Sequence, residues 1–500
     1  MPKAQPNILL IVTDHQLHYR HGWDGGQGPL RPCFEALGAE GTTFDRAYCA
    51  APLCGPARRS LLTGMYPHNH RNIHNQSESD YHHTTYLDTL HALGYHNYYF
   101  GKWHAGPGTA LDHHCEGLSP AFYGNPYITP EYAAYVERLG LPKATHRIDK
   151  LFWHGDTKTG FPQLIEGATG YRCDRSWCGE TALGITETPK ETHECFFLAD
   201  LACRQLEALA AQPDRGPFHL RVDFWGPHQP YFPTQEYVDL YDPTQIREYG
   251  NFRDDLTNKP ATYRHMNRPI ADEQGNLIVP SIFSWNEWRA MLVQAYAQST
   301  MVDDAAGRII EKLDDLGFKD DTLVIYTSDH GDALASHGGM FDKGSFMTEE
   351  TVRIPLAIRY PAFASGGNHT QALVNTIDLA PTLLAAAGRD VFAQVDGENL
   401  LPLLQDPQAT LRESLLLESY GQGYRDKLKA RTVVTARYKY TINEHDIDEL
   451  YDLESDPYEL DNLAQHPAYQ QLRAELATEL KNLMDRYHDH DMIVATGFDK

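Results

Sequence analysis

The sequence contains no run of about 20 apolar residues, the length that an α-helix needs to cross a bilayer, so we expect no membrane-spanning segment. It is also poor in positive charge. Lys and Arg total 43 against 68 Asp and Glu, and the formal net charge of -25 at pH 7 disfavours nonspecific binding to nucleic acid. An anionic substrate must therefore be received by a local basic pocket within an acidic surface.

The N-terminus lacks the apolar region and the cleavage site of a signal peptide, because residues 1–7 lead directly into a strand-like run. We expect a cytoplasmic protein, periplasmic or secreted only if a signal peptide has been removed. The 8 cysteines are scattered, and the spacings Cys173/Cys178 and Cys195/Cys203 fit standard zinc-ligand pairs poorly. This pattern favours reduced cytoplasmic thiols.

Residues 7–13 form a continuous apolar, β-branched run of the kind found in central strands covered on both faces. Residues 218–225 and 322–328 also predict strands. Ligands in open α/β sheets gather at the carboxyl ends of strands. The polar residues that follow these three segments are Asp14, His228 and the pair Asp329-His330.

The predicted fold class is α/β, with a large domain whose central mixed, mostly parallel sheet is flanked by helices. A smaller C-terminal α+β domain with an antiparallel sheet follows. We place these domains at residues 1–411 and 412–500. Within the first, we expect residues 112–192 and 235–285 to be insertions that form walls of the substrate pocket. Further predicted elements are helices over 194–211 and 288–316 and a strand over 352–358.

The stretch Cys54-Gly55-Pro56-Ala57-Arg58 leads into an apolar run that ends in Thr63-Gly64. One interpretation is a buried Cys at the start of a helix with Pro in the first turn. The stretch also resembles the Cys-x-Pro-x-Arg signature of the sulfatase family, within the alkaline-phosphatase superfamily. The resemblance implies that a maturation enzyme oxidises Cys54 to formylglycine. One oxygen of the hydrated aldehyde, a gem-diol, would attack sulfur, and the other would help to expel sulfate.

Further motifs of the family occur in the family's order along the chain. They are Gly101-Lys102-Trp103-His104, Pro227-His228-Gln229-Pro230, Ser328-Asp329-His330-Gly331 and Phe341-Asp342-Lys343-Gly344. Lys102 and His104, two residues apart on an extended segment, should point the same way. Asn75 matches, by its distance from Cys54, an Asn near the sulfate in the family; a solvated loop Asn is the alternative.

The resemblance implies one divalent metal, held by Asp14, Asp329, His330 and the diol derived from Cys54. Mostly oxygen ligands favour calcium, with magnesium or manganese as alternatives. The family has Asp-Asp or Asp-Gln where this chain has Asp14-His15-Gln16. Whether His15 or Gln16 is the further ligand therefore stays open.

The resemblance also implies catalytic roles. Arg58 would lower the pKa of the diol, and Lys102 and Lys343 would neutralise charge on the sulfate oxygens. His104 would accept the diol proton, and His228 would assist departure of the leaving group. The implied substrate-binding residues are Asn75, Lys102, His228 and Lys343.

Three hypotheses of function follow. The first is hydrolysis of a sulfate ester, either of a sulfated saccharide or oligosaccharide or of another small organic sulfate. The second is a phosphonate monoester or phosphodiester hydrolase of the same superfamily, in which the Lys and His of Gly-Lys-Trp-His are replaced. The third is a non-catalytic binding protein, against which the complete set of charged residues argues. The sequence leaves the substrate, endo- or exo-action and the oligomeric state open.

Overall fold

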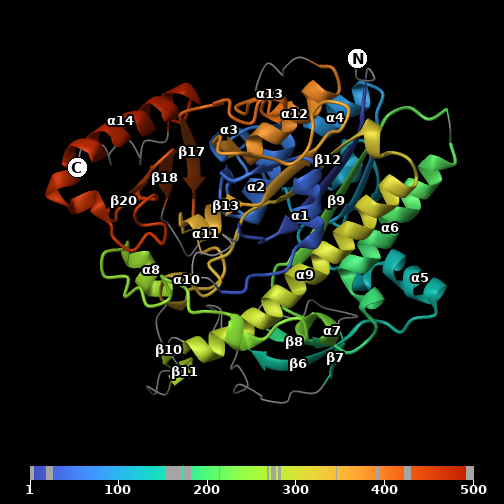
Figure 1. The fold of residues 1–500 in the computed structure, drawn as a ribbon, viewed down its shortest axis with the longest axis horizontal. Helices are drawn as coiled ribbons and strands as arrows, with labels where there is room; N and C mark the ends of the chain where they lie inside the picture. Colours follow the sequence, from blue (N-terminus) through green and yellow to red (C-terminus); the bar gives the residue numbers. More distant parts are fainter. Residues whose placement is uncertain are drawn as a thin grey trace.

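A computed structural model describes the chain between residues 5 and 490, with gaps (Figure 1). The described residues are 5–18, 26–151, 170–172, 182–212, 214–266, 270–271, 277–279, 283–344, 346–389, 395–421 and 429–490. No helix within these ranges is long and apolar enough to cross a membrane. Cys173 and Cys178 lie outside the described residues.

The large domain is built on a sheet of eight strands, whose bounds are β1 (Asn7–Asp14), β2 (Thr42–Phe44), β4 (His96–Gly101), β5 (Cys115–Leu118), β9 (Phe218–Pro227), β12 (Thr322–Ser328), β14 (Leu356–Arg359) and β15 (Asn368–Thr370). Their order is β15-β2-β14-β12-β1-β9-β4-β5. β1 runs parallel to β12 and β9, and the parallel pairing continues through β4 to β5. β14 is antiparallel to both β12 and β2. The predicted mixed, mostly parallel sheet is confirmed.

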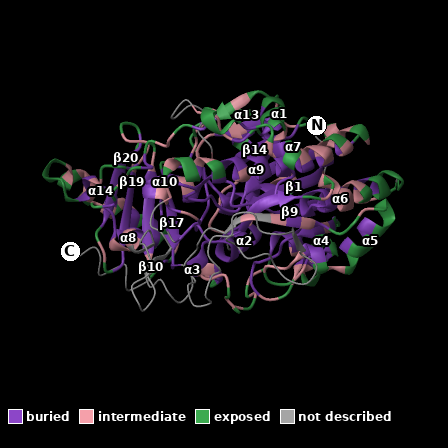
Figure 2. Ribbon diagram, turned by 90° about the horizontal axis from the view of Figure 1, so that it is seen from below, coloured by how far each residue is buried: buried purple, intermediate pink, exposed green. Residues whose placement is uncertain are grey.

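Helices cover both faces of this sheet. Leu9 and Ile11 of β1 belong to the core beneath one set of helices, whereas Ile8, Leu10 and Val12 belong to the core beneath the other. Successive side chains of a strand point to opposite faces, so a strand buried on both faces requires a continuous apolar run. Figure 2 shows β1 and β9 buried in the interior. The first set is α1 (Pro32–Glu40), α6 (Glu194–Ala210) and α9 (Trp285–Asp315), and the second is α2 (Cys54–Thr63), α4 (Tyr86–Ala92) and α12 (Leu379–Ala386).

The long helix α9 begins three residues earlier than the apolar periodicity predicts. The N–H of Glu287 donates to Oγ of Ser284 at 3.4 Å, and the N–H of Ser284 donates to the Glu287 carboxylate at 2.8 Å. This reciprocal capping box satisfies amide groups that the first turn of a helix otherwise leaves without partners. Capping therefore sets the start of the helix.

The predicted single strand over residues 352–358 is wrong. The segment forms β13 (Arg353–Ile354) and β14, which are separated by Pro355. β13 joins a second sheet with β3 (Ala47–Tyr48) and β16 (Val374–Asn375), whereas β14 joins the main sheet. Proline has no N–H to donate to a strand ladder, and the chain changes sheets at this residue.

The two predicted insertions contain regular structure that their weak periodicity did not reveal. The first holds α5 (Pro130–Leu139) and a three-stranded sheet of β6 (Thr145–Leu151), β7 (Gly170–Arg172) and β8 (Ala182–Thr186), but it begins before β5, which belongs to the main sheet. The second holds α7 (Gln235–Val238), α8 (Ala261–Met266), β10 (Ile270–Ala271) and β11 (Leu277–Val279). Most of these elements are too short to show a periodic apolar pattern.

The predicted C-terminal antiparallel sheet is confirmed. Its strands β17 (Ser414–Ser419), β18 (Ala430–Thr435), β19 (Tyr438–Asn443) and β20 (Glu449–Asp452) pair in chain order. Helix α14 (Gln470–Arg486) packs on this sheet, with Leu480 and Leu483 in one core with Val433 and Tyr440. The domain limits 1–411 and 412–500 stay predictions.

Buried ion pairs join the C-terminal sheet to the large domain. Nζ of Lys439, on β19, lies 3.3 Å from the carboxylate of Glu349 on α11 (Glu349–Val352) and 2.5 Å from that of Glu459. The second Glu459 oxygen accepts the backbone N–H of Glu349 at 2.7 Å. All three side chains are buried. Removing the Lys439 charge would leave two buried carboxylates without this cation, which is unfavourable in a low-dielectric interior. These contacts therefore hold the C-terminal sheet against the large domain.

His337 forms a second charged contact in the same region. Its Nδ1 lies 3.1 Å from the Asp254 carboxylate, and its Nε2 lies 3.3 Å from the Glu350 carboxylate. Burial opposes protonation of His337, but the charge of Glu350 and the hydrogen bond to Asp254 raise the pKa of His337 to about 9. His337 is therefore protonated in the folded protein at neutral pH.

We predict that the ion pairs of His337 with Asp254 and Glu350 make the free energy of unfolding depend on pH. The folded pKa of about 9 exceeds the ordinary value of 6.5, so the stabilisation is complete below pH 6.5 and is lost as the pH rises through 9. The loss should be on the order of 3 kcal/mol of unfolding free energy, measured by urea denaturation between pH 6 and pH 10. His337→Gln should remove this part of the decline and leave the part due to His68, whose pKa is raised to about 9 by Glu418 against the opposing effect of burial, whereas the exposed His369→Gln should behave as wild type. An equally steep decline in His337→Gln would refute the assignment.

Candidate functional site

Three adjacent strands end at the same edge of the main sheet. Thr13 of β1 is in register with Ser328 of β12, so Asp14 and Asp329 leave neighbouring strands at one level. On the other side of β1, Pro227 of β9 is in register with Asp14, and His228 follows it. The strand pairing therefore brings together polar residues that are more than 200 positions apart in the sequence.

Cys54 is the first residue of α2 and is fully buried. Its Sγ lies 3.1 Å from Nε2 of His330 and 3.8 Å from Nε2 of His15. The side chain of Asn75 accepts the N–H of Gly55 at 2.8 Å, which satisfies an amide at the start of the helix. Asn75, which the sequence places near the sulfate, thus holds the first turn of the helix that carries Cys54.

Asp14, His15, Cys54 and His330 form a candidate metal group. Each offers one ligand atom, these atoms all lie within 4.8 Å of one another, and all four residues are buried. The side-chain oxygen of Gln16 is engaged elsewhere: Oε1 accepts hydrogen bonds from Thr13 Oγ1 at 2.7 Å and from the Tyr326 hydroxyl at 3.2 Å. Geometry therefore favours His15 over Gln16 as the further ligand from β1.

The two histidines present lone pairs to the group. Nδ1 of His330 donates to the carbonyl of Gly331 at 2.8 Å, and Nδ1 of His15 donates to the carboxylate of Asp332 at 3.0 Å. In a neutral imidazole the other nitrogen, Nε2, then carries no proton. Burial lowers the pKa of both rings well below the ordinary value, which keeps them neutral. Both Nε2 atoms face Cys54, and Nε2 of His15 also accepts a hydrogen bond from Nζ of Lys343 at 2.7 Å, which a bound metal would displace.

The carboxylates of the site carry charge that is incompletely balanced. Burial opposes ionisation of Asp14, but Lys102, His228 and Arg58 hold its pKa well below the ordinary value. Burial and the nearby Asp14 raise the pKa of Asp329. Oδ1 of Asp14 has no hydrogen-bond partner among the described residues. A divalent cation would satisfy this oxygen and relieve the repulsion between the two carboxylates, so the residues fit a metal.

Asp329 lies just outside the candidate metal group. One of its oxygens accepts the N–H groups of His15 at 3.2 Å and His330 at 2.8 Å, and the other accepts Nε of Arg58 at 2.9 Å. Arg58 also donates through Nη1 to Asp223 at 2.7 Å. The described contacts of Arg58 therefore include two carboxylates beneath Cys54.

Sequence reasoning missed Asp223. This residue also accepts Nε of Arg221 at 2.6 Å, so one carboxylate pairs with two guanidinium groups, and all three side chains are fully buried. Charged residues two apart in an otherwise apolar central strand were the available signal, since burying such charges requires partners. Tyr123, in the segment to which the sequence assigned no chemistry, was also missed.

The predicted basic residues line the same site. Nζ of Lys102 contacts the carboxylate of Asp14. Nζ of Lys343 donates to Nε2 of His15 at 2.7 Å and to Asp342 at 2.9 Å, and the ring of His228 lies 3.9 Å from that of His15, centroid to centroid. A local basic set within an acidic protein is what an anionic substrate requires.

The backbone that carries Lys102 and His104 differs from the predicted extended segment. β4 ends at Gly101, so these residues are not on a strand, and His104 has a left-handed backbone with φ of 44°. The N–H of His104 donates to the carbonyl of Phe122 at 3.0 Å. His104 is therefore oriented by the loop that follows the strand and not by alternation along the strand.

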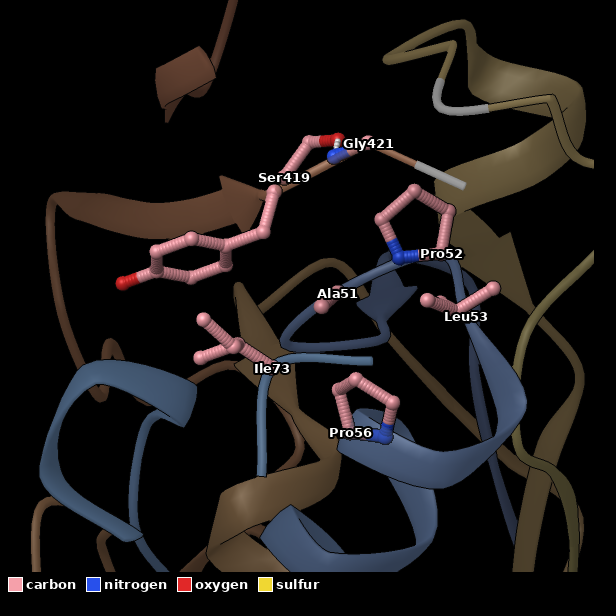
Figure 3. A pocket seen from close by; sticks show the side chains of 8 residues that line it. Ala51, Pro52, Leu53, Pro56, Ile73, Ser419 and Gly421 are labelled. Carbon is pink, nitrogen blue, oxygen red and sulfur yellow. Dashed lines mark hydrogen bonds between the residues drawn. The ribbon is translucent and has the colours of Figure 1, made fainter. Parts of the chain in front are cut away.

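Cavities adjoin the site. One is lined by residues flanking Cys54 and by the end of β17, and its lining carries no charged side chain (Figure 3). The other is lined by His228 and, from the 112–192 segment, by Tyr127 and His146. The lining of the first is Ala51, Pro52, Leu53, Pro56, Ile73, Ser419, Tyr420 and Gly421.

Residues 6–389 match the family model Sulfatase, and residues 336–486 match the model N-sulphoglucosamine sulphohydrolase, C-terminal. The first match covers more than half of the chain. The protein therefore belongs to the sulfatase family, and it is a sulfuric ester hydrolase. This confirms the resemblance inferred from the motifs.

Proteins of similar sequence also include sulfatases. The chain is 30% identical over 474 residues to the choline-sulfatase of Rhizobium meliloti (strain 1021), covering 93% of this chain and 84% of the relative. It is 25% identical over 543 residues to the N-acetylglucosamine-6-O-sulfatase of Bacteroides thetaiotaomicron, covering 97% of this chain and 88% of the relative.

Solved structures share the fold. The phosphonate monoester hydrolase of Agrobacterium radiobacter matches with a TM-score of 0.75 and 22% identity, over 97% of this chain and 96% of that one. A protein solved in complex with its substrate D-glucosamine-2-N,6-O-disulfate matches with a TM-score of 0.74 and 22% identity, over 97% and 99%. These likenesses confirm the α/β fold.

We predict that His15, and not Gln16, binds the metal. His15→Ala should weaken divalent-metal binding by at least about 10-fold, because a nitrogen ligand is lost, whereas Gln16→Ala should leave it nearly unchanged. Calorimetric titration of metal-free protein with Mn²⁺ and Ca²⁺ measures both. If Gln16→Ala weakened binding more than His15→Ala, the assignment of the ligand would be wrong.

Proposed function

We propose that this sulfatase hydrolyses a sulfate ester of a saccharide or another small organic molecule, using formylglycine formed from Cys54 and one divalent metal. The observation that carries the proposal is the geometry around Cys54. Its Sγ faces the Nε2 atoms of His15 and His330 at the point where Asp14 ends β1. Lys102 and Lys343 reach the same group from separate loops.

The environment of Cys54 supports its conversion. Burial raises the pKa of the Cys54 thiol to about 12, even though Lys102 and Lys343 oppose the shift. An unmodified thiol with this pKa is almost wholly protonated at neutral pH and is a poor nucleophile. The hydrated aldehyde supplies a hydroxyl to attack sulfur and a second hydroxyl whose deprotonation expels sulfate. We expect a maturation enzyme as a transient partner of the chain.

We assign metal binding to Asp14, His330 and the group derived from Cys54, with Asp329 beside them and His15 added to the predicted set. A bound cation would stabilise negative charge on the nucleophilic oxygen. Calcium prefers oxygen ligands, whereas imidazole nitrogens are common ligands of first-row transition metals. Manganese is the one transition metal of the three that the sequence suggests, so the mixed donor set supports it over calcium, which the sequence favoured.

The remaining catalytic roles would fall to charged side chains around Cys54. Lys102 and Lys343 would receive sulfate oxygens as developing charge appears. His104 would accept the proton of the second hydroxyl as the aldehyde re-forms and sulfate is expelled, since burial lowers the pKa of His104 and leaves it neutral. His228 would donate a proton to the departing alcohol. Arg58, which contacts Asp329 and Asp223, would fix the carboxylates and add positive charge beneath the nucleophile.

Relatives support a sulfated saccharide as substrate, because they include an N-acetylglucosamine-6-O-sulfatase and a protein bound to D-glucosamine-2-N,6-O-disulfate. Choline sulfate is an alternative, given the choline-sulfatase at 30% identity. The second candidate function is phosphonate monoester or phosphodiester hydrolysis, supported by the phosphonate monoester hydrolase fold. Lys102 and His104 favour sulfate, since a phosphodiester carries an additional organic arm that Lys102 would crowd.

We predict that mature enzyme carries formylglycine at position 54. Mass spectrometry of the Cys54 peptide, from a host with the maturation system, should show a loss of about 18 Da. The buried Cys49 is the internal control, because fragment ions should place the change at Cys54 and show the Cys49 thiol unchanged. Cys54→Ala should be inactive. Full activity with an unmodified Cys54 thiol would refute the proposal.

We predict that His104→Ala releases one equivalent of alcohol and then stops. Loss of a positioned general base typically costs 10²–10⁴-fold, and here it should block expulsion of sulfate. The measurement is a burst of alcohol followed by near-zero turnover, with sulfate retained on the Cys54 peptide. A wild-type preference for phosphodiesters, together with unchanged activity of His104→Ala, would contradict the sulfatase mechanism.

A further inference from the structure

Residues 119–125, here called the Tyr123 loop, link two signature segments of the candidate site. The loop follows β5 and is tied on one side by the hydrogen bond from the N–H of His104 to the carbonyl of Phe122, at 3.0 Å. On the other side, Nε1 of Trp225 donates to the carbonyl of Tyr123 at 2.7 Å. Trp225 precedes His228 near the end of β9. Consecutive carbonyls of one loop thus hold the His104 segment and the His228 segment.

The conformation of the loop is tightly specified. Phe122 and Gly124 both have left-handed backbones, with φ of 55° and 73°. A Cβ at Gly124 would lie 2.8 Å from Cβ of Pro120 and 3.4 Å from the ring of Trp225, so any side chain there would push the loop away from Trp225. The loop accordingly gives the Tyr123 side chain a fixed place.

The ring of Tyr123 contacts three residues of the candidate substrate site. Nζ of Lys102 lies 4.1 Å from the ring centroid. The rings of His104 and His228 meet it in edge-to-face arrangements, at centroid distances of 5.6 Å and 5.4 Å. These three side chains come from the segments that follow β4 and β9, which are more than 100 residues apart in sequence.

Lys102 is the partner most sensitive to this contact. Its side chain is fully buried and its ammonium also contacts the carboxylate of Asp14. An ammonium beside one carboxylate is drawn towards it, and the aromatic face supplies a second, uncharged attraction that does not neutralise the cation. The positive charge and the remaining N–H donors of Lys102 are therefore available to a third partner.

We propose that Tyr123 is a positioning residue for sulfate recognition: its ring holds the Lys102 ammonium and sets the spacing of His104 and His228. The inference rests on the proposed function, because it assigns sulfate contact to Lys102. It adds a residue that lies outside every signature motif of the chain.

The test compares Tyr123→Leu and Tyr123→Phe with wild-type enzyme, using Phe122→Leu as a matched control. The Phe122 side chain is 63% exposed, so the control makes the same aromatic-to-aliphatic change at the next position of the loop. Tyr123→Leu should lower kcat/KM for the sulfate ester about 10-fold and raise the inhibition constant of inorganic sulfate by a similar factor. Tyr123→Phe should stay within about 3-fold of wild type because it retains the ring, and Phe122→Leu should have no effect.

A double-mutant cycle separates positioning from general stabilisation. If Tyr123 acts through Lys102, Tyr123→Leu should add little to sulfate inhibition in a Lys102→Met background. Additive effects would overturn the inference, as would wild-type sulfate inhibition in Tyr123→Leu or an equal loss in Tyr123→Phe. Lys102→Met with wild-type sulfate inhibition would instead refute the proposed role of Lys102. Should Tyr123→Leu fail to fold by thermal melting, Tyr123→Met carries the same test.

Discussion

The site depends on burying several carboxylates close together at the ends of parallel strands. Asp14, Asp223 and Asp329 are each nearly or fully inaccessible to water, and Arg58 reaches all three, at 3.7 Å, 2.7 Å and 2.9 Å. An isolated buried carboxylate would be unstable, so this guanidinium is a structural requirement of the fold as well as part of the site. Arg58 lies one helical turn beyond Cys54, and the same contacts therefore fix the start of α2 against the sheet.

Much of this arrangement could be predicted from the sequence. Buried parallel strands need continuous apolar runs, and the residues that follow such runs meet at one edge of the sheet. This is why residues 7–13 and 322–328 predicted both the strands and the neighbourhood of Asp14 and Asp329. The C-terminal antiparallel sheet was predicted for a related reason, since its alternating strands face one core.

Other features depend on contacts between distant segments and leave little trace in a local pattern. The preference for His15 over Gln16 depends on which way each side chain leaves the end of β1, because Thr13 and Tyr326 bind the Gln16 side chain. Tyr123 lies in a Gly-, Pro- and Tyr-rich stretch with no periodicity, and only the folded loop brings it to Lys102. Pro355 indicates in the sequence where the predicted strand is interrupted. Nothing in the local pattern indicates that the chain then joins a different sheet.

The ion pairs of Lys439 with Glu349 and Glu459 bear on how this chain can be divided and recombined. Removing the C-terminal sheet would take the Lys439 ammonium away from Glu349, six residues along the chain from Lys343, and leave this carboxylate with its contacts to Arg353 and Tyr48. The two family models overlap over residues 336–389, a stretch that contains this lysine. A recombination boundary that separated the sheet from the large domain would therefore disturb the segment that carries Lys343, the residue proposed to receive sulfate oxygens.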